Sequence, residues 1–141
     1  MDYASITELD LSNKGLTKLP DLSIYTNLKK LNCSENEITR LSNLPQTIIE
    51  LDCHCNNITN LDNLPPTIIE LYCGYNNITR LDNLPSTLIG LYCSGNKIAK
   101  LDNLPQTLIY LYCSCNQITS LDNLPPKIIK LYCHKNSHRK T

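Results

Sequence analysis

A repeat of twenty residues runs through almost the whole chain of 141 residues. Leucine, cysteine and asparagine each return at this spacing. The leucines are Leu31, Leu51, Leu71, Leu91, Leu111 and Leu131; the cysteines are Cys33, Cys53, Cys73, Cys93, Cys113 and Cys133; the asparagines are Asn36, Asn56, Asn76, Asn96, Asn116 and Asn136. So short a period predicts a solenoid, in which each coil buries its apolar side only against its neighbours. Because a solenoid offers a long regular surface rather than a pocket, the period favours a binding function.

Seven coils can be counted from the apolar residue that opens each predicted strand. They begin at Ile6, Leu28, Ile48, Ile68, Leu88, Leu108 and Ile128. We therefore expect a single domain over residues 1–141, long enough to bury a real core. It consists of a capping-like first repeat at 6–27, five repeats of twenty residues over 28–127, and a truncated last repeat with a basic tail at 128–141.

Within each coil, apolar and polar residues alternate over a short stretch, as from Ile69 to Cys73. This alternation predicts a strand with one buried face, and in-register strands from successive coils form one parallel sheet. The return path carries Leu-Asp-Asn-Leu-Pro, for example at 61–65, where the following Pro66 excludes a helix. Only about ten residues separate the asparagine from the next strand, so we expect an extended or polyproline-like return with short 3₁₀ pieces.

These columns resemble the leucine-rich-repeat pattern L-x-x-L-x-L-x-x-N-x-L, with cysteine at the third leucine position. One coil shows it as Ile68, Leu71, Cys73, Asn76 and Ile78. Leu-Pro before the strand is similar to the short repeats of effector proteins from enteric bacterial pathogens. The recurring tripeptide Leu-Tyr-Cys is similar to the repeats of leucine-rich-repeat proteins of giant DNA viruses of amoebae. The resemblance implies a right-handed leucine-rich-repeat solenoid, a parallel sheet on its concave face, little or no α-helix, and a protein-binding function.

Two departures from the family pattern matter. Lys14 stands where the first coil would carry the asparagine, which suggests a cap. The bacterial effectors also have helical N-terminal caps, and some have a catalytic ubiquitin-ligase domain. Only five residues lie on either side of the repeats here, so we expect neither feature and no enzyme activity.

The cysteine and asparagine columns are expected to be structural. Six cysteines follow the inward leucine by two residues, where a small apolar side chain fits the core. Cys55 and Cys115 lie outside that column, three coils apart, and are too distant to form a disulfide with each other. We therefore expect eight free thiols. Each asparagine amide is expected to bond the backbone of its own and the adjacent coil.

Outward strand positions line the expected concave face and supply the candidate binding residues. They start acidic and then become a tyrosine stripe. The candidates at these positions are Tyr72, Tyr92, Tyr110, Tyr112 and Tyr132, with Glu50, Asp52 and Glu70; Tyr75, just beyond the strands, is a further candidate. Tyrosine supplies rigid contact area with a polar tip and is enriched at binding hot spots. The alternative is that tyrosine simply suits a pleated surface and stacks along the sheet.

No residue pattern favours catalysis, a metal or a cofactor. Glu50, Asp52 and Glu70 could raise one another's pKa, but without a protected cleft they are better explained as a solvated acidic patch. Cys53-His54-Cys55 and Cys133-His134 with His138 resemble fragments of metal sites. The two clusters lie four coils apart, which does not suit the converging tetrahedral ligands of zinc.

The distribution of charge bears on the partner. The net charge is zero, so nucleic acid and acidic membranes are not expected partners. Residues 1–80 carry ten acids and six bases, and residues 81–141 three acids and seven bases, which gives −4 and +4. The start of the chain does not suggest a secretory signal, so we expect a cytoplasmic protein, in the host cytoplasm if it is virus-encoded.

We therefore expect a protein partner, and the resemblance to giant-virus proteins implies a host-cell protein. One alternative is self-association through exposed solenoid ends, since Ile128, Leu131 and Cys133 open a coil that no further coil covers. Another, weaker alternative is glycan binding by tyrosine and asparagine.

Overall fold

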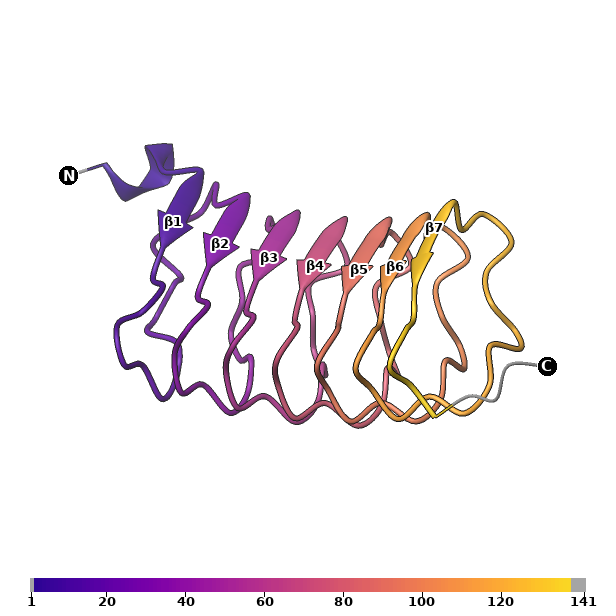
Figure 1. Ribbon diagram of the computed structural model, residues 1–141. Coiled ribbons are helices and arrows are strands. Elements are labelled where there is room, and N and C mark those ends of the chain that lie inside the picture. The colour runs from indigo at the N-terminus through magenta and orange to yellow at the C-terminus, as the bar shows by residue number, and fades with distance from the viewer. Residues whose placement is uncertain (1, 138–141) are drawn as a thin grey trace.

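The computed structural model describes residues 2–137 and consists of coils stacked side by side along one axis (Figure 1). Each coil contributes one short strand to a single seven-stranded parallel sheet, whose strands follow one another in chain order. They are β1 (Glu8–Asp10), β2 (Lys30–Asn32), β3 (Glu50–Asp52), β4 (Glu70–Tyr72), β5 (Gly90–Tyr92), β6 (Tyr110–Tyr112) and β7 (Lys130–Tyr132). A 3₁₀ helix, η1 (Tyr3–Ser5), precedes β1. The predicted solenoid with one parallel sheet and almost no helix is confirmed.

The strands pair without offset, so equivalent residues of successive coils lie beside one another. Leu51 pairs with Leu31 on one side and Leu71 on the other. The leucine of each strand points into the core, where Ile68, Leu71 and Cys73 of one coil are all fully buried. Burying like against like at every coil is the main apolar contribution to stability. The side chains before and after each leucine point away from the core, and we call the surface that they form the outer sheet face.

The return path is made of extended segments and single turns. The N–H of Ile68 donates to the carbonyl of Pro65 at 3.3 Å, which closes one turn with Pro66 at its second position, where proline is favoured. The expected 3₁₀ pieces do not form on this path, and η1 is the 3₁₀ helix of the described residues. The next N–H that could extend the turn, that of Ile69, donates instead to the carbonyl of Ile49 in the preceding coil, at 2.8 Å. The Thr67 hydroxyl adds a bond to the carbonyl of Ile48, at 2.6 Å.

Each asparagine of the column joins two coils. Asn76 Nδ2 donates to the carbonyls of Cys53 and Cys73 at 3.0 and 3.1 Å. Its Oδ1 accepts the N–H of Ile58, one coil earlier, at 2.9 Å. The side chain therefore satisfies buried backbone groups where the chain leaves the sheet.

The first coil shows why it needs no asparagine of its own. The N–H groups of Lys14 and Leu16 both donate to Asn36 Oδ1, at 3.0 and 2.9 Å. Each asparagine thus serves the coil before it, and no coil precedes the first one within the described residues. Asn36 Nδ2 also donates to the carbonyl of Leu11, at 2.9 Å, so Lys14 can occupy the equivalent position in the first coil.

The last coil is packed on one side only. Ile128, Leu131 and Cys133 are half-buried, and Ile129 is 75% exposed. Part of the predicted basic tail, with His138, Arg139 and Lys140, lies outside the described residues. Among residues 2–137, no helix has the length and apolar character to cross a membrane.

Candidate functional site

The tyrosine column, which we define as Tyr72, Tyr92, Tyr112 and Tyr132, is the most distinctive feature of the outer sheet face. The rings of Tyr72 and Tyr92 are stacked, with centroids 4.4 Å apart and planes 6° apart. Tyr112 follows Tyr92 at 4.9 Å with a tilt of 36°, and Tyr132 stacks on Tyr112 at 4.5 Å. In-register pairing of β4 to β7 places one ring on each strand and so builds this stack.

Stacking limits which parts of each ring can meet a partner. The inner rings cover one another's faces and are half-buried, whereas Tyr132 at the end is 46% exposed. A partner can therefore contact only the exposed part of each half-buried ring. The column therefore combines both predicted roles of tyrosine, packing along the sheet and supplying rigid contact area.

A shallow depression of about 310 Å³ lies beside the column. Its lining residues are Asp52, His54, Tyr72, Gly74, Tyr75, Tyr92, Ser94 and Tyr112. Gly74 and Ser94 occupy the outward position that follows the cysteine of each coil. Because these residues are small, they leave space for the depression between the larger side chains around it. A Cβ on Gly74 would lie 3.0 Å from the carbonyl oxygen of Ser94, so the two coils approach closely at this point.

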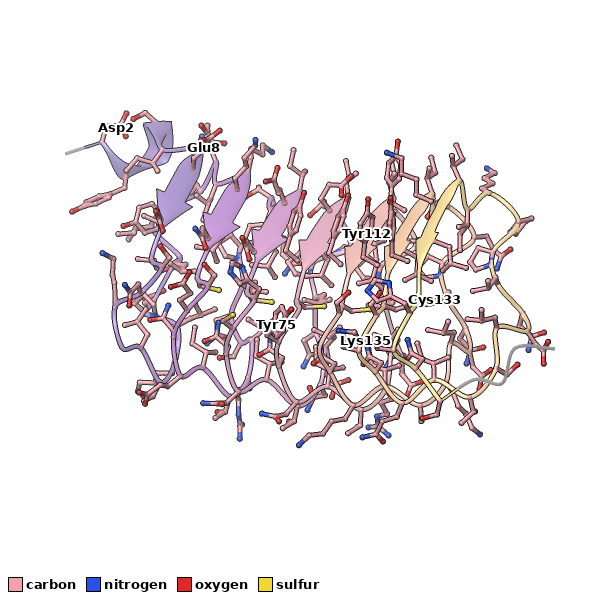
Figure 2. The ribbon with its side chains drawn as sticks, in the orientation of Figure 1. Asp2, Glu8, Tyr75, Tyr112, Cys133 and Lys135 are labelled. Atoms are coloured by element: carbon pink, nitrogen blue, oxygen red, sulfur yellow. The ribbon has the colours of Figure 1, made fainter. Side chains whose placement is uncertain are left out.

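Tyr75 forms the wall of the depression opposite the column. It lies beyond the end of β4, whereas Tyr112 lies on β6 (Figure 2). Its backbone is left-handed, with φ of 53°, and its side chain is 65% exposed. The ring leans over the next coil, because a Cβ on Gly95 would lie 2.7 Å from Tyr75 Cδ1. Tyr75 is thus the most exposed of the predicted contact residues.

Tyr110 lies apart from both features. It occupies the first outward position of β6, one column away from the stack. The Lys130 ammonium lies 5.9 Å from its ring centroid, within the range of a cation–π contact. The aromatic surface of this end of the sheet therefore already holds one cation.

The three predicted carboxylates lie on β3 and β4 and differ in their partners. Glu50 Oε2 is 3.3 Å from the Lys30 ammonium. Asp52 Oδ1 is 2.6 Å from His54 Nδ1. Glu70 bends over Gly90, whose missing side chain leaves the room, and its Oε2 is buried without a hydrogen-bond partner.

Burial raises the pKa of the Glu70 carboxyl above its usual range; nearby Glu50 adds to this effect and the Tyr92 hydroxyl opposes it. The pKa of Tyr72 is also raised, first by burial and then by the negative charges of Glu70, Glu50 and Asp52. All three carboxylates therefore lie close enough to influence the first ring of the column.

The eight cysteines are all free. Five of the six in the column are buried, while Cys133 in the last coil is half-buried and Cys55 and Cys115 are exposed. Burial raises the pKa of Cys33 and of Cys113 to about 12, so these thiols stay protonated and unreactive. Within residues 2–137, no three His, Cys, Asp or Glu side chains are grouped so as to hold a metal ion.

Sequence reasoning missed three lining residues of the depression, His54, Gly74 and Ser94. The available signal was the third outward column, two residues after the tyrosines, where serine, histidine and glycine alternate. A column of serine, histidine and glycine does not by itself indicate a binding site. Their importance comes from the neighbouring rings, which only the three-dimensional arrangement reveals.

Comparison with known proteins supports this architecture. Residues 86–126 match the family described as Leucine Rich repeats (2 copies). YopM from Yersinia enterocolitica WA-314 is 34% identical, with a TM-score of 0.86 over 94% of this chain and 29% of that chain. A Shigella effector LRR domain is 31% identical, with a TM-score of 0.85 over 96% of this chain and 61% of that one.

The functional domain of InlJ from Listeria monocytogenes, which includes a cysteine ladder, is 35% identical with a TM-score of 0.80 over 94% of this chain and 31% of that chain. The chain spans less than two thirds of each of these three proteins. A comparison with curated protein sequences finds no match. The expected likeness to proteins of giant viruses stays a prediction. The twenty-residue repeat, the seven-stranded parallel sheet and these likenesses together show that the chain is a leucine-rich-repeat protein with short repeats, similar to bacterial effector proteins.

Proposed function

We propose that the chain is a non-enzymatic protein-binding module whose outer sheet face receives a segment of a protein partner. The observation that carries the proposal is the tyrosine column with the depression beside it. Aromatic side chains bordering a shallow hollow are typical of protein contact surfaces, in which tyrosine supplies much of the binding energy.

The stacking of the rings favours this function on energetic grounds. A side chain that becomes immobile on binding costs about 0.5–1.5 kcal/mol of conformational entropy. Tyr92 and Tyr112 are already held between neighbouring rings, so a partner does not have to order them. Such a preorganised surface binds more tightly than the same residues on a mobile loop.

The proposal can be tested by selecting binders from a phage-displayed library of random twelve-residue peptides. Selected peptides are then titrated by calorimetry against the wild type and against the Tyr92→Ala/Tyr112→Ala variant. We expect binding to the double variant to be weaker by about 30-fold or more, as for the loss of hot-spot residues. Far-ultraviolet circular dichroism checks that the variant keeps its fold.

Tyr3→Ala is the matched control. Tyr3 is 40% exposed and packs edge-to-face on Tyr25 at the N-terminal end, with centroids 5.6 Å apart, away from the tyrosine column. This variant should bind the selected peptides as the wild type does. Peptides that bind the double variant with unchanged affinity would show that another surface is responsible and that the proposal is wrong.

Self-association is a second candidate, favoured by the exposed Ile129 and the half-buried residues around it. The lysines of the last coils, Lys127, Lys130 and Lys135, could meet the acidic residues Glu8 and Asp10 of β1 in a second copy. Sedimentation equilibrium at increasing concentration tests this candidate. An Ile129→Lys variant should reduce any association, and a monomer at all concentrations would rule the candidate out.

A further inference from the structure

We infer that the segment bound by the outer sheet face carries an arginine or lysine side chain, and that this cation is anchored among Glu50, Asp52 and Glu70, at the N-terminal end of the tyrosine column. The inference rests on the proposed function and adds the chemistry of the partner. Four features of the face support it.

The first feature is charge. Over β1–β4 the outer sheet face carries five carboxylates, Glu8, Asp10, Glu50, Asp52 and Glu70, against the single ammonium of Lys30. Five negative charges and one positive charge leave four negative charges on this half of the face. The ammonium of Lys30 is shared, at 3.9 Å from Glu8 and 3.3 Å from Glu50. A cationic partner group is therefore attracted to this half, since unlike charges steer association.

The second feature is the state of the carboxylates next to the column. Glu70 Oε2 is buried and accepts no hydrogen bond within the described residues. In Asp52, one oxygen, Oδ1, accepts the backbone N–H of His54 and also lies within hydrogen-bond distance of His54 Nδ1. Asp52 Oδ2 therefore remains able to accept a hydrogen bond from a partner, whereas the buried Glu70 contributes mainly its negative charge. A guanidinium or ammonium group supplies several donors and the opposite charge at once.

The third feature is the end of the ring stack. One face of Tyr72 is covered by Tyr92, with nearly parallel planes. On the other side, the strand neighbour of Tyr72 is Asp52 in β3. The column of rings thus stops where the carboxylates begin. A planar guanidinium can stack on an aromatic ring while its edge pairs with carboxylates, which makes arginine the better fit of the two cations.

The fourth feature is the opposite end of the same face, where the protein makes a similar contact with its own residues. Lys130 extends over Tyr110 and approaches to 5.9 Å from the ring centroid. No carboxylate stands on the outer positions of β5, β6 or β7 to hold a second cation. The two ends of the face therefore differ in charge, and the cation of a partner segment is favoured at the N-terminal end.

The test uses N-acetylarginine amide as the probe and N-acetylcitrulline amide as its neutral, nearly isosteric control. Each is titrated into isotopically labelled protein while backbone amide and tyrosine ring resonances are recorded by NMR. We expect arginine, and not citrulline, to shift the resonances of Tyr72 and of Asp52. Raising the salt concentration from about 20 to about 300 mM should weaken the effect, because salt screens exposed charges.

A charge-matched pair of variants locates the effect. Glu50→Gln/Asp52→Asn/Glu70→Gln should bind the probe about five- to tenfold more weakly, as expected for a lost cation contact. Asp62→Asn/Asp82→Asn/Asp102→Asn removes the same charge from the return path and should bind it as the wild type does. The two-dimensional NMR spectrum shows directly whether each variant is folded.

Equal shifts with citrulline, or unchanged arginine binding to the first triple variant, would overturn the inference. If the peptides selected above still require Tyr92 and Tyr112, the proposed function survives that result. If instead the peptides do not require those tyrosines, the proposed function and the cation inference are both wrong. A cation bound by the three carboxylates would then not come from a protein segment on this face.

Discussion

Replacing Asn76 by alanine tests how much of the stability of this solenoid comes from side-chain hydrogen bonds between coils. Asn76 is 7% exposed and belongs to the middle coil, with neighbours on both sides. Its amide makes its bonds to the backbone of its own coil and the preceding one, through Nδ2 and Oδ1. Alanine keeps the backbone conformation and removes all of these bonds together.

The cost can be estimated from the groups that lose a partner. Each of the two lost bonds from Nδ2 to a cysteine carbonyl costs about 1 kcal/mol, because Asn56 still bonds the Cys53 carbonyl and Asn96 still bonds the Cys73 carbonyl. The N–H of Ile58 has no other partner within the described residues, and leaving it buried and unpaired costs about 1–3 kcal/mol. The free energy of unfolding should therefore fall by about 3–5 kcal/mol, a large share of the total for a domain of this size.

Urea unfolding followed by circular dichroism measures this loss. With a slope of about 2 kcal/mol per molar urea, the midpoint should fall by about 2 M. Asn57→Ala is the matched control, since Asn57, which follows the column asparagine of the preceding coil, is exposed and its side chain makes no hydrogen bond within residues 2–137. A surface change of this kind should alter stability by less than about 0.5 kcal/mol.

The end of the solenoid supplies an internal comparison. Asn136 makes the equivalent bonds to the Cys113 and Cys133 carbonyls, and its Oδ1 accepts the N–H of Ile118. It is only half-buried, so water can replace part of what alanine removes. Asn136→Ala should therefore cost about half as much as Asn76→Ala. If Asn76→Ala proved no more destabilising than Asn57→Ala, the asparagine column would not be what joins the coils.

Two further predictions concern titratable groups. In native protein, Ellman's reagent should react rapidly with the exposed Cys55 and Cys115 and slowly with the half-buried Cys133. The five buried thiols should not react. Rapid reaction of all eight thiols would contradict the buried cysteine column. Because burial raises the pKa of Glu70, the folded state holds this proton more tightly than the unfolded chain, and stability is lost as the pH rises through the folded-state value. Glu70→Gln should therefore raise the melting temperature at about pH 7 and lose this advantage at about pH 3, where the wild-type carboxyl is also neutral. The same gain at both pH values would show that the charge of Glu70 is not the cause.

The sequence predicted the sheet and the core because each depends on residues that recur at one spacing. Leu71 and Cys73 have equivalents in every neighbouring coil, so their burial follows from stacking the coils in register. The same argument places Tyr72 beside Tyr92. It does not give the angle between their rings, which depends on how each side chain packs against the next.

The left-handed positions could be predicted only in part. Asn63 and its equivalents in the return path take positive φ, as asparagine tolerates well. The residue before each column asparagine does the same, although it is a tyrosine, a cysteine or a glutamate in different coils. No residue type marks this position. The direction of the Tyr75 ring, and with it one wall of the depression, therefore could not be derived from the sequence.

The position of Glu70 shows a second limit. Its carboxylate is buried because Gly90, twenty residues later, leaves room for it. In a strand, Gly90 by itself indicates weaker local structure and not a site. Only the pairing of β4 with β5 shows that the two residues face each other.

Variation between the repeats separates what the fold requires from what it leaves free. All seven strands have the same register and the same inward leucine, so the backbone imposes no difference between β3 and β4. The outward residue nevertheless changes from Asp52 to Tyr72 at that step and stays tyrosine to the last strand. Since neither aspartate nor tyrosine is needed to form the sheet at this position, the change is not explained by folding. A boundary of this kind between carboxylates and stacked rings fits the partner that we propose, which presents a cation to the carboxylates.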